Sequence, residues 1–407
     1  MGRDTTGVAR QSRLRFYLVL ASLTTLGPFS LDMYLPGLPA LASELRSTES
    51  TSQLTLTACL FGLALGQLVA GPISDITGRR LPLMVGIVTY TIASIFCAVA
   101  PSIYSLIGFR LLQGIAGGAA AVIATAVVRD RFTGRAAAQF FSLLLLVTLI
   151  SPLLAPIFGG ELLLVTSWRG VFLALAVIGV GLLLVATLGL PETLPRAQRR
   201  RGGLRNAVQT MGRLAADRAF LSYAVPAALG GGAIFTYLSG SSFVLERAFG
   251  ASPQVYGLMF ALNGVALGVS SQINRWLLGR VSTERLFVVG LVVLSAGGVA
   301  LLIAVSLRLE SLGSVVAPVM LIFASNGFIA PNSLALALSP HPDAAGTGSA
   351  LLGSWRYALG GLAAPLVGIF GSNSALPLGL TMSILCLGAG LAYLGLRSRH
   401  IDAICAT

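Results

Sequence analysis

The chain has 407 residues, of which 55% are hydrophobic and only 10% are charged, and its mean hydropathy is +0.87. A soluble domain carries about a quarter charged residues, so this composition excludes a soluble globular protein and indicates one embedded in a membrane. In such a protein the net charge of +13 does not indicate a nucleic-acid partner. All 27 basic residues are arginines, and a chain without lysine cannot form the usual Walker A loop of ATP-driven pumps.

Twelve apolar stretches reach the roughly 20 residues that a transmembrane helix needs, so we predict an all-α integral membrane protein with 12 transmembrane helices. The predicted spans are 16–42, 52–73, 81–100, 102–128, 137–162, 168–190, 219–241, 254–278, 285–306, 312–339, 346–370 and 376–396. If the N-terminus is cytoplasmic, 21 arginines fall on inner segments and four on outer connections. This asymmetry follows the positive-inside rule and predicts that both termini are cytoplasmic.

A basic stretch in the middle of the chain divides the spans into two groups. It reads "PETLPRAQRRRGGLRNAVQTMGRLAADR", and we interpret it as a solvated linker that can also contact anionic lipid headgroups. The sequence "DITGRRLPLMVG" after the second span has a weaker counterpart, "RWLLGRVSTERLFVVG", after the eighth. We therefore predict an N-terminal six-helix bundle (1–190), a cytoplasmic linker (191–218) and a C-terminal six-helix bundle (219–407) related by pseudo-symmetry.

The first span contains "PFSLDMYLPGLPAL", in which Asp32 is an isolated acid among prolines at positions 28, 36 and 39. Prolines that break helix regularity are tolerated where the helix lines a cavity. Burial favours the protonated form of a carboxylate and a nearby cation favours the ionised form, so Asp32 beside Arg110 of the fourth span could load and release protons. We expect Asp32 to couple transport to protons, and the alternative is a purely structural pair with Arg110.

The connection between the second and third spans reads "GPISDITGRRLPL" and resembles motif A of the major facilitator superfamily. The matching residues are Gly71, Asp75, Gly78, Arg79 and Arg80. The stretch departs from the motif at Ile76, where a basic residue is common. The resemblance implies a conformational latch, in which Asp75 and Arg79 hold the two halves together on the cytoplasmic side in the outward-open state. The alternative is an ordinary basic turn at the inner surface.

The fourth span, "RLLQGIAGGAAAVIATAVVRD", places Arg110 within the membrane, where a charge normally faces a cavity or a partner. The glycines Gly114, Gly117 and Gly118 allow close helix packing. The stretch is similar to motif B of the superfamily, whose arginine is associated with proton coupling. The alternative role for Arg110 is a hydrogen-bond centre for backbone carbonyls.

The fifth span contains "SPLLAPIFGGELL", which resembles the antiporter motif C, although Ala155 replaces its first glycine. The motif residues are Pro152, Pro156, Gly159 and Gly160. This stretch is close to the form found in the Bcr/CflA (bicyclomycin/chloramphenicol resistance) group. Other similar stretches are "LDMYLPGLPAL", "SWRGVF", "SPQVYGLMFALN" and "AGTGSALLGSWRYALGG", so the resemblance covers both halves. It implies the major facilitator fold and an exporter of antibiotics or other small amphipathic drugs that exchanges them for protons by alternating access.

Other function classes fit the sequence less well. The alternative on the same fold is a proton-coupled uptake symporter for a small nutrient. No Ser, His and Asp constellation or set of metal ligands indicates an enzyme, a metal site or a cofactor. A channel would more often show a filter loop or a ring of like charges. We therefore expect a monomeric multi-pass transporter of the bacterial inner membrane whose partners are a drug, protons and lipid.

Several polar or aromatic side chains fall inside predicted spans and are candidates for the substrate cavity, with helix packing as the alternative for each. These residues are Phe29, Tyr34, Gln67, Gln113, Tyr237, Asn263, Asn332 and Arg356. Arg356 is unexpected because the predicted spans of the C-terminal half contain no acid to pair with it. It could bind an acidic or carbonyl-rich substrate, donate to backbone carbonyls, or lie in a water-filled cavity.

Overall fold

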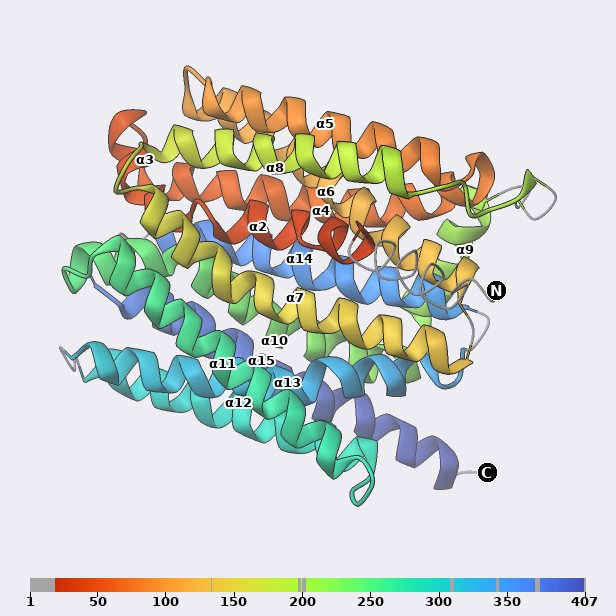
Figure 1. Ribbon diagram of the computed structural model, residues 1–407. Coiled ribbons are helices and arrows are strands. Elements are labelled where there is room, and N and C mark those ends of the chain that lie inside the picture. The colour runs from red at the N-terminus through yellow and green to blue at the C-terminus, as the bar shows by residue number, and fades with distance from the viewer. Residues whose placement is uncertain are drawn as a thin grey trace, which may run out of the picture.

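The computed structural model describes most of the chain, and all its regular secondary structure there is helical (Figure 1). The described residues are 19–132, 134–196, 199, 203–307, 311–341, 344–369 and 374–405. Some arginines used in the orientation argument lie outside them, namely Arg3, Arg10, Arg13, Arg15, Arg200, Arg201 and Arg308. The all-α prediction is confirmed.

The helices of the two halves follow one another in the predicted order. The first half forms α2 (Leu26–Asp32), the 3-10 helix η1 (Leu35–Gly37), α3 (Leu38–Glu44), α4 (Glu49–Thr77), α5 (Arg80–Ala98), α6 (Ile103–Arg131), α7 (Gly134–Leu162) and α8 (Trp168–Gly189). After α9 (Gly203–Ala216), the second half forms α10 (Arg218–Phe243), the π-helix η3 (Val244–Ala248), α11 (Pro253–Leu277), α12 (Thr283–Ser306), α13 (Leu312–Leu338), α14 (Ala345–Ile369) and α15 (Leu376–Cys405).

Eight of the described helices are long and apolar enough to cross a membrane, namely α4, α5, α6, α8, α10, α12, α13 and α15. The other predicted spans coincide with α2–α3, α7, α11 and α14. Several of the helices begin at a residue whose side chain accepts a backbone N–H of the first turn, as serine, threonine and aspartate do at N-caps. These N-caps are Thr48, Ser102, Ser167, Asp217, Ser252, Ser282 and Ser311.

The first span is not one continuous helix. Helix α2 ends at Asp32, the short η1 contains Pro36, and α3 starts directly after it with Pro39 in its first turn. Proline lacks the N–H that helix continuation needs, so prolines are tolerated at such restarts. The break that these prolines mark therefore lies immediately after the acid of this span.

Helices α4 and α6 pack closely because glycines face backbone on both sides of their contact. A Cβ on Gly62 or Gly66 of α4 would overlap the carbonyl oxygens of α6, and one on Gly114 or Gly118 would overlap those of α4. Small residues let two membrane helices approach to backbone contact. This packing sets the position of the helix that carries Arg110.

In Figure 1, α4, α5, α6 and α8 occupy the upper part and α11, α12, α13 and α15 the lower part, with α7 and α14 between them. We call the end where α4 meets α5, and where α9 lies, the motif A end, and the opposite end the far end. The halves meet where α4 packs on α14 and α7 packs on α11. Thr57 Oγ1 donates to the Gly361 carbonyl oxygen (2.9 Å), and Gln254 Nε2 donates to that of Gly160 (3.1 Å). Both bonds lie in the half of the molecule toward the far end.

The segment between the halves is not solvated throughout. Residues 203–216 form α9, which contacts α4, α10 and α14. Leu214 of α9 is 2% exposed and packs with Phe220, Leu351 and Leu352 of the second half. The linker is therefore anchored by an apolar contact as well as carrying charge.

Candidate functional site

The isolated acid of the first span is buried. Asp32 is 2% exposed, and its Oδ1 atom has no hydrogen-bond partner in the part of the chain that the structure describes. It lies within electrostatic range of the Arg110 guanidinium of α6 and of the phenols of Tyr256 of α11 and Tyr357 of α14. The carboxylate therefore lies between the two halves.

Arg110 is surrounded by hydrogen-bonding and aromatic side chains of the first half. It is fully buried, and its Nη1 donates to Gln113 Oε1, while Gln113 Nε2 donates to Ser94 Oγ (2.7 Å). The guanidinium carbon lies 4.3 Å from the ring centroid of Tyr34 and 5.5 Å from that of Phe172. Such stacking stabilises a desolvated guanidinium by about 2 kcal/mol.

The two predicted proton-coupling residues do not form a direct ion pair. Their charges act on each other through the interior, but the structure records no salt bridge between the described side chains of Asp32 and Arg110. Two of the Arg110 donors, Nε and Nη2, also have no partner. Unpaired groups on both residues leave room for a change of partner during transport.

The motif A residues converge on Arg79. Its Nη1 lies 2.6 Å from Asp75 Oδ1 and also donates to Ser74 Oγ (2.6 Å), and its Nε lies 2.8 Å from Asp130 Oδ2 at the end of α6. Gly78 caps α4 with a φ of 100°, which glycine adopts readily. All these partners belong to the first half.

Glu192, just after α8, is part of the same cluster and was not identified from the sequence. Its carboxylate accepts the backbone N–H groups of Arg79 (2.9 Å), Arg80 (3.3 Å) and Leu194 (3.0 Å). Partial burial raises the pKa of Glu192, but these hydrogen bonds outweigh burial and hold its pKa below the ordinary value. The available signal was an acid directly after the sixth span, which we had assigned only to the linker.

The motif C residues lie in α7, where they contact other helices. A Cβ on Gly159 would overlap the carbonyl oxygen of Met33, the residue after Asp32. The Gly160 carbonyl accepts from Gln254 of α11, and Pro152 and Pro156 lie inside the helix. Motif C therefore joins the break of the first span to the second half.

Two cavity candidates of the second half form a buried group with unsatisfied polar atoms. Tyr237 is 1% exposed, and its ring stacks on Phe260 (6.2 Å between centroids) and meets Phe323 edge-on (5.6 Å). Asn263 is fully buried, and its amide faces the Tyr237 hydroxyl without a hydrogen bond of normal geometry among the described residues. Unpaired buried amides are costly, so these groups are suited to a polar ligand.

The remaining candidates are dispersed. Asn332 is satisfied within the second half, because its Nδ2 donates to Asn274 Oδ1 (2.7 Å) and to the Phe328 carbonyl (2.8 Å). Gln67 is partly exposed on α4 and faces Gly353 of α14. A packing role therefore fits Asn332, whereas Gln67 lies at the contact between the halves.

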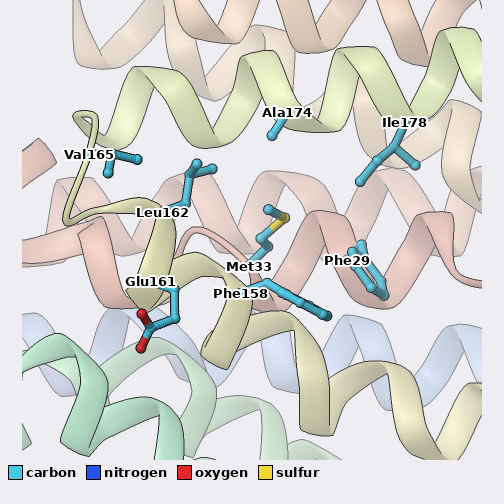
Figure 2. Close-up of a pocket in the computed structure, with 8 residues that line it drawn as sticks. All are labelled: Phe29, Met33, Phe158, Glu161, Leu162, Val165, Ala174 and Ile178. Atoms are coloured by element: carbon cyan, nitrogen blue, oxygen red, sulfur yellow. The ribbon is translucent and has the colours of Figure 1, made fainter.

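Phe29 lines a pocket between α2, α7 and α8 (Figure 2). The pocket has a volume of about 530 Å³ and is almost entirely apolar apart from Glu161. Its lining residues are Phe29, Met33, Phe158, Glu161, Leu162, Val165, Ala174 and Ile178. Because Phe158 and Val165 are 52% and 82% exposed, the pocket opens at the protein surface rather than into the interior around Asp32.

A second pair at the motif A end was also missed. His341, between α13 and α14, contacts the Asp217 carboxylate at the start of α10 through its Nε2. Burial raises the pKa of Asp217, but hydrogen bonds from His341 and the Ala219 amide outweigh it, so the pKa is lowered overall. Among the described residues, no three His, Cys, Asp or Glu side chains are grouped as metal ligands.

Comparison with known proteins identifies the family of this helical membrane protein. The sequence profile of the Major Facilitator Superfamily matches residues 20–365. The MFS-type transporter YdgK of Bacillus subtilis (strain 168) is 37% identical over 393 residues, which cover 96% of this chain and 97% of that protein. The multidrug resistance protein MdtL of Escherichia coli (strain K12) is 31% identical over 340 residues, which cover 83% of this chain and 84% of MdtL. A bicyclomycin resistance protein homolog of Haemophilus influenzae is 28% identical over 394 residues, which cover 97% of this chain and 99% of that protein.

Solved structures share the fold at low sequence identity. The nucleoside transporter NupG has a TM-score of 0.75 at 12% identity and covers 95% of this chain and 100% of its own. A bacterial homolog of the human lysosomal transporter Spinster, in an inward-facing and occupied conformation, has a TM-score of 0.73 at 15% identity. The match covers 95% of this chain and 97% of that protein. The chain therefore belongs to the Major Facilitator Superfamily, resembles its Bcr/CflA-type members, and is a multi-pass membrane transporter of small molecules rather than an enzyme.

Proposed function

We propose that this transporter exports small amphipathic drugs in exchange for protons. The observation that carries the proposal is the buried, incompletely hydrogen-bonded Asp32, which lies at a break in its span and interacts electrostatically with Arg110 and with both halves. A titratable group buried between moving parts defaults to a coupling role. The names of the relatives MdtL and bicyclomycin resistance protein homolog support drugs as the substrate class.

The exchange proceeds by alternating access between two bundles, with the motif A end facing the cytoplasm of a bacterial inner membrane. Hydrogen bonds between the halves lie toward the far end, which fits a state closed toward the outside. In the opposite state, Asp75 and Arg79 act as the latch at the motif A end. The chain works as a monomer because both halves of the pathway belong to it.

The test is transport by the full chain in liposomes, with ethidium and bicyclomycin as probes. An imposed proton gradient should drive each probe against the proton flux, without ATP, and liposomes containing Asp32→Asn should not respond. Movement of the probe in the same direction as protons would identify the uptake symporter instead. Transport that ignores the pH gradient would reject proton coupling.

A further inference from the structure

Arg356 lies near the middle of α14 and packs against α10. A Cβ on Gly231 of α10 would lie 2.7 Å from Arg356 Nε and 3.0 Å from its Cγ, so the side chain runs directly over that glycine. One turn further along α14, Gly360 faces Phe235 of the same helix. The exposed Leu362 belongs to another face of α14. Arg356 is therefore directed along α10 rather than toward the lipid-facing side.

No described residue neutralises this guanidinium. The structure records no salt bridge, hydrogen bond or aromatic stacking for Arg356, and its buried Nε has no partner. The ionisable group found within electrostatic range of it among the described residues is Tyr357, which is uncharged at neutral pH. An arginine remains charged in a protein, and an unpaired charge inside a membrane is costly. Donation to backbone carbonyls is therefore not its role in this structure.

The charges of the interior leave a positive excess. Among the described residues, Asp32 is the one buried acid. When ionised, it compensates for only one of two arginines, the buried Arg110 and the partly buried Arg356. A ligand with a single negative charge would make the loaded interior neutral. An aromatic pair lies one helical turn away, where Phe235 meets Gly360 and the ring of Tyr357 is 5.2 Å from that of Phe235. The site thus offers one cation next to apolar rings.

We propose that Arg356 binds the anionic group of the substrate, and that the preferred substrates are amphipathic organic acids with a single carboxylate. This inference rests on the proposed export function and specifies its substrate class. The carboxylate occupies the unpaired guanidinium donors, and the apolar body lies against the aromatic rings between α10 and α14.

The test compares dansylglycine with dansylglycinamide, which share one body and differ in the charged group. Binding to the purified full-length protein in detergent is followed by dansyl fluorescence. A charge-assisted hydrogen bond is about twice as strong as a neutral one, so the parent protein should bind the acid about tenfold more tightly than the amide. In Arg356→Gln this preference should disappear.

Two further variants make the result specific. Arg356→Lys retains the charge without the planar fork and should keep part of the preference, which also covers the case in which Arg356→Gln does not fold. Arg280→Gln removes an exposed arginine that stacks on Trp276 (4.1 Å) at the motif A end and should keep all of it. Equal binding of acid and amide by the parent protein, or a preference that persists in folded Arg356→Gln, would overturn the proposal.

The same measurements are made in chloride and in gluconate buffers, because a small inorganic anion has the same charge as the carboxylate. The acid preference should persist in both. Its loss in chloride would assign Arg356 to an inorganic anion and overturn the proposal. Proton-driven transport of the neutral bicyclomycin and of dansylglycine is measured in parallel. If bicyclomycin is exported but the acid is not preferred, only the substrate class is wrong, and if neither probe responds to the gradient, the export function itself fails.

Discussion

Arg110 and Arg356 are arginines within long helices of opposite halves, yet their surroundings differ. Arg110 donates to Gln113 and lies over Tyr34 and Phe172, whereas Arg356 has no recorded partner among the described residues. An arginine supplied with partners by its own fold contributes to that fold. One left without partners reduces stability and is retained for what it binds. The comparison is consistent with our proposals that Arg110 takes part in coupling in the first half and that Arg356 takes part in recognition in the second.

The largest effect should come from Asp32→Asn, which keeps the size of the side chain but cannot titrate. Gradient-driven export should fall to the level of empty liposomes while the protein still reaches the membrane. The deciding measurement is proton release on substrate binding in detergent, followed with a pH dye. If Asp32→Asn releases as many protons as the parent, the coupling site is elsewhere, and Glu161 is the next acid to test.

The matched variants Arg110→Gln and Arg356→Gln should change thermal stability in opposite directions. Arg110→Gln loses stacking that is worth about 2 kcal/mol and should lower the apparent melting temperature of substrate-free protein by several degrees. Arg356→Gln removes an unpaired charge and should raise that temperature or leave it unchanged. The apparent melting temperatures of both variants are measured on detergent-purified protein, as the fraction that remains monodisperse in size-exclusion chromatography after heating. A similar loss of stability in both variants would show that the two arginines have the same structural role.

A smaller effect is expected at the motif A end. Asp75→Asn or Arg79→Ala should slow turnover severalfold and leave substrate binding nearly unchanged, because the Arg79 cluster is separate from the interior around Asp32. Transport and binding are measured on the same preparations, with Arg280→Gln as the control. A loss of binding equal to the loss of transport would argue against a latch.

The smallest effect should be the pH dependence contributed by Glu192. Its pKa is below the ordinary value of 4.5, so its ionised form stabilises the folded protein. This contribution is complete above pH 4.5 and is lost as the pH falls through the lowered pKa. Glu192→Gln should therefore melt about 1 °C below the parent at pH 7, and the difference should vanish in acid. A difference independent of pH would show that the carboxylate charge is not involved.

The residues that the sequence analysis selected were of two kinds. Asp32 and Arg110 stood out because charge is rare in apolar spans, and the motif A residues stood out because their order resembles a family motif. The structure buries Asp32 and Arg110 and places Arg79 in a network of ion pairs. Asn332 looked equivalent to Asn263 in sequence, but the first donates a good hydrogen bond to Asn274, whereas the second only faces the Tyr237 hydroxyl without normal hydrogen-bond geometry. A polar residue inside a span does not reveal whether another helix will satisfy it.

Glu192 was missed for a related reason. Its partner Arg79 is 113 residues away, and nothing in the sequence around either residue indicates that the two are in contact. The acid was visible, but a polar segment after a span is ordinarily solvated. In the folded protein, the end of α8 lies next to the start of α5. This packing brings the Glu192 carboxylate to the backbone N–H groups of Arg79 and Arg80.

By itself, the sequence determined that the chain is helical, where its membrane helices lie and which charges are enclosed by them. These features follow from the bilayer, which admits a backbone only when its hydrogen bonds are made within the segment. The tertiary structure decided which enclosed groups have partners: that Asp32 lies between the halves, that Arg79 is held by the first half, and that Arg356 is unpaired. Such contacts depend on how separate helices pack, and that packing is not encoded in the composition of any one helix.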